Sequence, residues 1–256
     1  MSKELAGEKV VMLGNAAIAR GAYEAGVKVS AAYPGTPSTE ISENIIKYQD
    51  DIYAEWSPNE KVAMEVAVGA SMSGVRALVS MKHVGVNVAS DPLYTVSYCG
   101  VNGGLVLVAA DDPGLYSSQN EQDSRMVARA AMVPVIEPSD SEEARVFIKR
   151  AFELSEEYDT PIIFRETTRL AHSQGIVNLE ERVDLPDKPY EKNIAKNVMM
   201  PGNAIKRHLV VEERLKRMAE DANTLDINKV EYNGTKIGVI TSGIPYQYVK
   251  EACPNA

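Results

Sequence analysis

The chain has 256 residues, of which 45% are hydrophobic and 25% charged, so it is long enough for one large α/β domain whose core needs no disulfide or metal. Its net charge of −9 argues against general nucleic-acid binding, which requires a basic face. Cys99 and Cys253 form no CxxC pair, so neither a zinc site nor an iron–sulfur cluster is expected within the chain, and a reducing, cytoplasmic compartment suits them. The sequence opens without a signal peptide and holds no apolar run of membrane-spanning length, so no membrane association is expected.

Short apolar runs alternate with segments of helical periodicity through the first 170 residues. The runs predicted as strands are 10–13, 27–33, 52–55, 77–81, 105–110, 134–137 and 161–164. The predicted helices are 16–25, 39–48, 60–73, 88–98, 121–131 and 142–157. Most strands are too apolar to have one solvent-exposed face, which indicates burial on both sides. The alternation of strands and helices predicts an α/β fold with a doubly wound parallel sheet. Ligands of such sheets bind where strands end and helices begin.

The alternation fades after residue 169, which divides the chain into three parts. Residues 1–170 form the predicted α/β domain, and residues 171–234 a linker or arm. The arm holds a charged helix at 204–222, expected to be solvated, with packing on a neighbouring chain as the less favoured alternative. Residues 235–256 contain a predicted strand at 236–241 and a helix at 246–252, which together resemble the truncated start of a second α/β domain.

The segment YPGTPSTE at 33–40 follows the second predicted strand. Thr36 has the character of a helix N-cap, with Pro37 at the first helical position. The free N–H groups at such a helix start can also face an anion, for example a ligand carboxylate. A structural cap and an anion site are both compatible with this segment.

The segment EWSPNEK at 55–61 follows the third predicted strand. Ser57 and Glu60 have the spacing of a capping box, which is the structural explanation of this pattern. The helix that follows is rich in small residues between Ala63 and Gly74, which would let another chain or a flat ligand approach closely. Glu60 also lies at the carboxyl end of a strand, where sites form in α/β sheets.

Two further polar segments follow predicted strands. Lys82 and His83 come directly after the fourth strand and precede a glycine, which suits an active-site loop, although a solvated turn explains the pattern equally well. Residues 117–125 form a polar stretch that runs into a helix. A solvated loop is the simpler interpretation of 117–125, and a cover over a bound cofactor is the alternative.

Five segments together resemble the alpha subunits of indolepyruvate ferredoxin oxidoreductases, within the 2-oxoacid ferredoxin oxidoreductase superfamily. They are YPGTPSTE at 33–40, EWSPNEKVAMEVAVGAS at 55–71, MKHVGVNVASDPL at 81–93, SSQNEQDSR at 117–125 and TSGIPYQYVKEA at 241–252. They occur in the same order over nearly the whole chain. The resemblance implies that residues 1–170 bind the aminopyrimidine of thiamine diphosphate.

The resemblance also implies roles for individual residues. Glu60 would be catalytic, because the family's matching glutamate hydrogen-bonds the N1′ atom of the pyrimidine and supports the tautomer that removes the C2 proton. Pro34 and Gly35 would bind the cofactor with it. Thr36, Lys82 and His83 would bind the substrate, and Lys82 or His83 could shuttle a proton. No residue of this chain is expected to bind a metal.

The family's remaining machinery has no counterpart in this sequence. No GDG motif and no ferredoxin-like cysteine segment is present, so Mg²⁺, the diphosphate, 4Fe-4S clusters and coenzyme A are expected to bind only in the complete enzyme. Its expected reaction is the oxidative decarboxylation of indolepyruvate and other arylpyruvates to aryl-acetyl-CoA, with ferredoxin as electron acceptor. The expected partners are the rest of the alpha subunit and a beta subunit, in a hetero-oligomer. The fragment alone is expected to be inactive.

Two other functions fit the same residues. One is a related thiamine-dependent oxidoreductase or decarboxylase for another 2-oxoacid. The other is a non-catalytic α/β module that binds a partner. The carboxyl of Glu60 argues against the second, because such a module would tolerate glutamine there.

Overall fold

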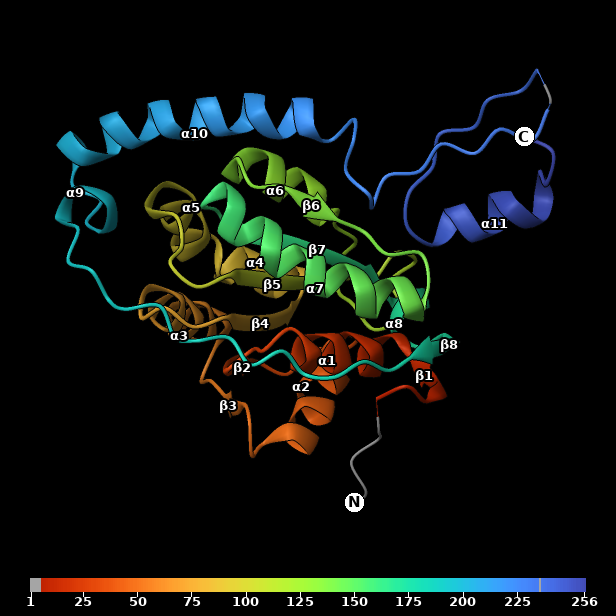
Figure 1. Ribbon diagram of the computed structural model, residues 1–256, viewed down its shortest axis with the longest axis horizontal. Helices are drawn as coiled ribbons and strands as arrows, with labels where there is room; N and C mark the ends of the chain where they lie inside the picture. Colours follow the sequence, from red (N-terminus) through yellow and green to blue (C-terminus); the bar gives the residue numbers. More distant parts are fainter. Residues whose placement is uncertain (1–5, 235) are drawn as a thin grey trace.

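The computed structural model describes residues 6–234 and 236–256. The main feature is a six-stranded parallel sheet with the order β3-β2-β4-β5-β7-β6 (Figure 1). Its strands are β2 (Val29–Ala32), β3 (Tyr53–Trp56), β4 (Ala77–Lys82), β5 (Leu105–Asp111), β6 (Val135–Ile136) and β7 (Ile162–Thr167). The central strands β4 and β5 are buried at every residue, and their sequences are accordingly apolar at most positions. The predicted doubly wound parallel sheet is therefore confirmed.

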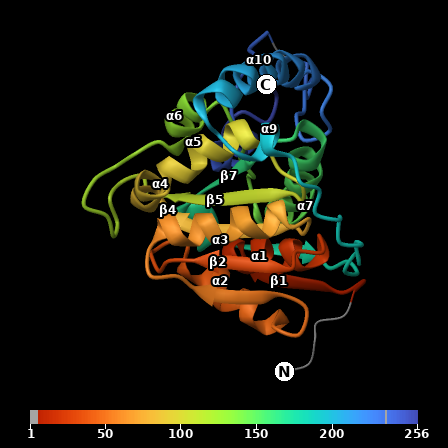
Figure 2. The same ribbon diagram turned by 90° about the vertical axis from the view of Figure 1, so that its left-hand side faces the viewer.

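Helices cover both faces of this sheet. One face packs against α1 (Gly14–Glu24), α2 (Thr39–Ile45), which continues into η1 (Ile46–Tyr48), and α7 (Ser141–Tyr158). The other packs against α3 (Glu60–Met72), α4 (His83–Val88), α5 (Ser90–Cys99) and α6 (Ser124–Ala131). In Figure 2, α4 and α7 lie on opposite sides of β5. Alternate residues of each strand enter one or the other of two separate apolar cores.

Two predicted strands differ from expectation. Residues 10–13 do form a strand, β1 (Lys9–Leu13), but it pairs antiparallel with β8 (Gln174–Asn178) in a separate two-stranded sheet. Val11 is 65% exposed there, so β1 lacks the double burial of a central strand. The strand predicted at 236–241 is wrong: these residues pair with no strand in the described part of the chain, and Ile240 is fully exposed. Position 235, where this predicted domain begins, lies outside the described residues.

The later part of the chain lies over the domain. After α8 (Thr168–Ala171) and β8, the arm continues to α9 (Ile194–Asn197), α10 (Pro201–Asp221) and α11 (Ile244–Ala252). Helix α10 crosses α5 and the end of α7 (Figure 1). The guanidinium of Arg207 donates to the carbonyl of Tyr98 at 2.6 Å, and that of Arg214 to Ser97 O at 2.7 Å and Asp159 O at 2.7 Å. Most of α10 is solvated, as expected, while Val211 and Arg214 are buried.

Among the described residues, no helix combines the length and the apolar character that crossing a membrane requires.

Candidate active site

The predicted site residues come together at the carboxyl edge of the parallel sheet. Pro34, Gly35 and Thr36 follow β2, Glu60 opens the helix after β3, and Lys82 and His83 lie at the end of β4. Because β3, β2 and β4 are adjacent, these segments meet at one edge. Two glycines join them. A Cβ atom on Gly35 would lie 3.0 Å from Lys82 Cβ, and one on Gly85 would lie 2.6 Å from both Cγ and Oε1 of Glu60.

Glu60 is the first residue of α3, and its carboxylate lies directly against the backbone of Gly85 in α4. The side chain is half-buried, and its carboxylate makes no hydrogen bond or ion pair with any residue that the structure describes. The positive end of the α3 dipole favours an anion at this position. A half-buried carboxylate without a protein partner is available to hydrogen-bond a ligand.

The predicted capping box at Ser57 is wrong. The N-cap of α3 is Asn59, whose side-chain oxygen accepts a hydrogen bond from the N–H of Val62 at 3.0 Å. Ser57 instead donates to Glu55 Oε1 at 2.9 Å. Asparagine is at least as good an N-cap as serine and stands directly before the first helical residue, so it takes the role. Glu60 therefore takes no part in capping α3.

The predicted cap at Thr36 is also wrong. Helix α2 begins at Thr39, because both the N–H and the hydroxyl of Ser38 donate to the carbonyl of Gly35, at 2.9 and 2.8 Å, and form a turn before the helix. The N–H of Gly35 in turn donates to Thr39 Oγ1 at 2.9 Å. Thr36 is exposed beside this turn, which leaves its hydroxyl facing solvent.

Lys82 and His83 hold the loop between β5 and α6, residues 112–123. Strand β4 runs directly into α4, so the active-site loop expected at Lys82 and His83 is not formed, and both side chains are buried. Lys82 Nζ donates to the carbonyl of Ser117 at 2.8 Å, and His83 Nε2 donates to that of Asn120 at 3.1 Å. The segment expected to be a solvated loop or a cover is thus fixed to the sheet edge by these two side chains.

Asp112 fixes the same loop from its other end. Its carboxylate accepts hydrogen bonds from the N–H of Ser117 at 2.9 Å, the hydroxyl of Ser118 at 2.6 Å and that of Thr168 at 2.7 Å. Burial alone would raise the pKa of Asp112, but these hydrogen bonds and the nearby charge of Lys82 lower it to about 2. The loop is consequently held by an ionised group at neutral pH.

Three of the small residues of α3 face the chain's own core. Ala63, Ala67 and Ser71 are buried in the core that α3 shares with β2, β4 and α5. Gly69 and Ser73, on the opposite side, are exposed. The small side chains allow α3 to approach its own sheet closely.

The model of one protein family matches most of this chain. It is described as the thiamine-diphosphate-binding domain of pyruvate flavodoxin/ferredoxin oxidoreductases, and it covers residues 20–234. The chain belongs to this family. As a thiamine-diphosphate-binding domain it has the unpaired Glu60 carboxylate at the sheet edge where ligands of α/β proteins bind.

Curated relatives confirm the sequence resemblance. The indolepyruvate oxidoreductase subunit IorA of Archaeoglobus fulgidus is 46% identical over 264 residues, which cover 99% of this chain and 42% of that protein. The corresponding subunit of Pyrococcus horikoshii is 46% identical over 96% of this chain and 39% of its own length. The 2-oxoglutarate synthase subunit KorA of Methanothermobacter thermautotrophicus is 27% identical over 70% of this chain. This domain therefore spans about 40% of the length of its IorA relatives.

A solved structure has the same fold. It is the 2-oxoglutarate:ferredoxin oxidoreductase from Magnetococcus marinus, with 2-oxoglutarate, coenzyme A and succinyl-CoA bound. The superposition has a TM-score of 0.68, covers 83% of this chain and 45% of that one, and shows 17% identity. This likeness supports the architecture of the thiamine-diphosphate-binding domain.

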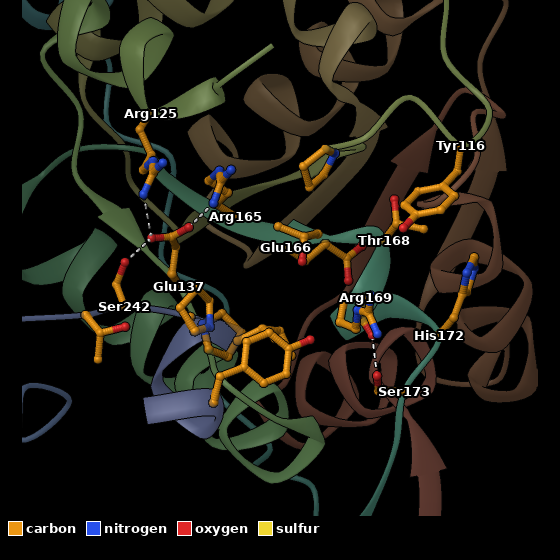
Figure 3. Close-up of a pocket in the computed structure, with 18 residues that line it drawn as sticks. Tyr116, Arg125, Glu137, Arg165, Glu166, Thr168, Arg169, His172, Ser173 and Ser242 are labelled. Atoms are coloured by element: carbon orange, nitrogen blue, oxygen red, sulfur yellow. Dashed lines mark hydrogen bonds and ion pairs between the residues drawn. The ribbon is translucent and has the colours of Figure 1, made fainter. Parts of the chain in front are cut away.

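A cavity beside the predicted site contains residues that the sequence did not single out. Its volume is about 820 Å³, and its walls come from the ends of β5, β6 and β7, from α8 and from residues 241–245 before and within α11 (Figure 3). Arg165 and Arg125 both pair with Glu137, which also accepts a hydrogen bond from Ser242 at 2.9 Å and so ties the α11 segment to the domain. The polar residues 165–169 directly after the predicted strand 161–164 were the available signal.

Glu166 is the unexpected member of this cavity. It is 1% exposed, and neither carboxyl oxygen has a hydrogen-bond partner among the described residues. Burial, and secondarily the charge of Glu40, raise the pKa of Glu166 well above its usual value. Glu40 itself accepts from Asn15 at 3.2 Å and lies 3.7 Å from His172 Nε2.

Proposed function

We propose that this chain is the pyrimidine-binding part of a thiamine-diphosphate-dependent 2-oxoacid:ferredoxin oxidoreductase that oxidatively decarboxylates indolepyruvate and related arylpyruvates. The observation that carries this proposal is the Glu60 carboxylate, half-buried and free of protein partners at the carboxyl edge of the sheet. The high identity to subunits named indolepyruvate oxidoreductase supports the substrate class.

The residues at this edge fit the cofactor's pyrimidine. Glu60 can share a proton between its carboxyl oxygen and a ring nitrogen, because no side chain competes for that oxygen among the residues described. Pro34 and Gly35 form the adjacent surface, and Gly35 lets the backbone after β2 approach Lys82 closely. Thiamine diphosphate, when bound, supplies a carbon nucleophile and an electron sink for decarboxylation.

The carboxylate of the 2-oxoacid is assigned to Thr36 and Lys82. The exposed hydroxyl of Thr36 is a free donor. The side-chain carbons of Lys82 lie against Gly35 in the same site, and its ammonium is directed to the carbonyl of Ser117. Lys82 would exchange its hydrogen bond with the neutral carbonyl of Ser117 for one with the substrate carboxylate, in which donor and acceptor are both charged. His83 would serve the same step by holding Asn120, and with it the loop, in place.

The rest of the reaction requires parts outside this chain. We infer that Mg²⁺, the diphosphate, 4Fe-4S clusters and coenzyme A are bound by the remainder of the alpha subunit and by a beta subunit. The complete enzyme would be a cytoplasmic hetero-oligomer that passes electrons to ferredoxin. The short share of the IorA length covered here, 39–42%, is consistent with this division of labour.

The test uses the complete enzyme, assembled with its partner subunits, and measures reduction of a viologen dye with indolepyruvate and coenzyme A. Glu60→Gln should lower kcat by about 10²–10⁴, the range for a removed acid–base group. Its melting temperature should change little, because the carboxyl has no hydrogen bond to lose. Glu65→Gln, five residues further along α3 and 53% exposed, is the matched control and should leave kcat unchanged. A Glu60→Gln enzyme that keeps more than about a third of the wild-type rate would contradict the proposal.

A further inference from the structure

Glu166 needs an explanation because an unpaired buried carboxyl is costly even when it is neutral. Both oxygens are shielded from solvent and neither finds a donor in residues 6–234 or 236–256. Asn15, which donates to Glu40 nearby, likewise has a buried side-chain oxygen without a partner. Three unpaired acceptor atoms, two on Glu166 and one on Asn15, near the Glu40 carboxylate indicate that a hydrogen-bond donor from outside the chain completes this region.

The sheet register places Glu166 beside the proposed substrate site. Lys82 pairs with Ala110 of β5, and Ala110 pairs with Glu166 of β7, so the three residues form one row across adjacent strands. Residues in register point to the same face, and neighbouring strands lie about 4.8 Å apart, so the Cα atoms of Lys82 and Glu166 are about 10 Å apart. Ala110, which lies between them, has only a methyl side chain and so leaves room along this row. A ligand whose carboxylate binds at Lys82 could extend along this row.

The cavity walls suit an aromatic group. Tyr116 and Tyr248 line it together with prolines, and its volume of about 820 Å³ is in the range of small-molecule sites. Figure 3 shows Glu166 between the Arg125–Glu137–Arg165 group on one side and Thr168, Arg169 and His172 on the other. Ser117, which accepts the hydrogen bond of Lys82, directly follows Tyr116, so one loop borders both the proposed carboxylate site and the cavity.

We propose that Glu166 is a specificity-determining residue that accepts a hydrogen bond from an N–H or O–H group on the aromatic ring of the 2-oxoacid. The inference rests on the proposed function, since it assumes that a 2-oxoacid carboxylate binds at Lys82. Both carboxyl oxygens of Glu166 lack a partner among the described residues, so either can accept this hydrogen bond. An indole N–H or a phenol O–H supplies the donor, whereas a plain phenyl ring leaves Glu166 unpaired.

The first experiment needs no variant. The complete wild-type enzyme is assayed by dye reduction with indolepyruvate and with its N1-methyl derivative, which lacks the ring donor. We expect kcat/KM to fall at least about tenfold on methylation, because a site built to hydrogen-bond a donor discriminates strongly against its absence. The cavity is large enough that an added methyl group should not be excluded by size. Equal kcat/KM for the two substrates would overturn the proposal.

The second experiment assigns the effect to Glu166. In Glu166→Leu, kcat/KM for indolepyruvate and 4-hydroxyphenylpyruvate should fall at least about tenfold, while that for phenylpyruvate stays within about threefold. Glu166→Gln keeps a carbonyl acceptor and should retain the wild-type preference. A purely structural Glu166 instead lowers all three values by the same factor, which would refute the role. If Glu166→Leu fails to fold, the methylation comparison still decides.

The two proposals fail separately. If the wild-type enzyme fails to reduce the dye with every 2-oxoacid tested, the proposed function itself is contradicted. One that is active but indifferent to the ring donor would contradict only the role of Glu166.

Discussion

Gly85→Ala tests whether catalysis requires the Glu60 carboxylate at the position seen in the structure. The new Cβ would lie 2.6 Å from Glu60 Cγ and Oε1, whereas ordinary contacts are 3.4–4 Å, so the carboxyl group must retreat by about 1 Å. A misplacement of about 1 Å in a reacting group can cost about 10²-fold in rate. We therefore expect kcat of the complete enzyme to fall by roughly that factor.

The stability of the Gly85→Ala enzyme, by contrast, should hardly change. Gly85 lies within α4 and has an ordinary helical backbone, so alanine should stabilise the helix by about 0.5–1 kcal/mol. The clash is with the flexible end of Glu60, which can rotate away at a cost of about 0.5–1.5 kcal/mol. The two effects nearly cancel, and the free energy of unfolding should change by less than about 1 kcal/mol.

The assay pairs viologen reduction with thermal unfolding of the same preparation. Gly69→Ala is the matched control: Gly69 lies in α3, is exposed, and has no atom within 4 Å of its added Cβ. This control should gain stability and keep its full rate. A Gly85→Ala enzyme with a rate within about threefold of wild type would refute the reasoning, because Glu60 would then act from some other position.

Two more predictions concern the domain's packing and its loop. Ala67→Leu should destabilise the domain by about 1–3 kcal/mol in urea unfolding, because it overpacks the core at a fully buried position; unchanged stability would mean that the core has room there. Asp112→Asn should speed proteolytic cleavage within 112–123, since hydrogen bonds to an ionised carboxylate are lost. The pKa of Asp112 is depressed in the folded state, so its stabilising effect is present above pH 3.8 and is lost as the pH falls toward about 2. Wild type, but not Asp112→Asn, should lose that increment between those pH values; parallel pH profiles would contradict it.

The sequence predicts the central sheet well because a strand that is buried on both faces is apolar at almost every position. The runs at 77–81 and 105–110 are apolar at almost every position, and they are the strands buried on both faces. For strands outside the central sheet, composition does not reveal the position in the fold. The run at 10–13 is equally apolar, yet β1 lies in a small outer sheet whose partner, β8, is about 160 residues away in the chain. The run at 236–241 has no strand beside it in the described part of the chain.

Helix starts were predicted less well because several residues compete for each cap. Ser57 and Thr36 both fit the pattern of a cap, but Asn59 and the turn at Ser38 take those roles. Only the fold decides which candidate stands at the right backbone position. The grouping of Glu60, Gly35 and Lys82 follows from strand order, which the ligand rule for parallel sheets anticipates.

Glu166 could not be recognised in the same way. A glutamate after a strand is ordinarily a solvated end residue, and its burial depends on α8, on residues 241–245 and on the alignment of β7 with β5. These are contacts between segments far apart in the chain. A sequence pattern within one segment carries no information about them.

The arginines of α10 have a consequence for how the domain opens. The last carbonyls of α5, which a helix end usually leaves to water, are bonded instead by Arg207 and Arg214 from a helix about 110 residues later. Detaching α10 would therefore break the hydrogen bonds at the α5 terminus and those of the buried Arg214 guanidinium at the same time. We expect amide hydrogen exchange in α10 and in the last turn of α5 to report one shared opening free energy. A segment that looks like an appendage to the sheet would then belong to the same cooperative unit as the helix beneath it.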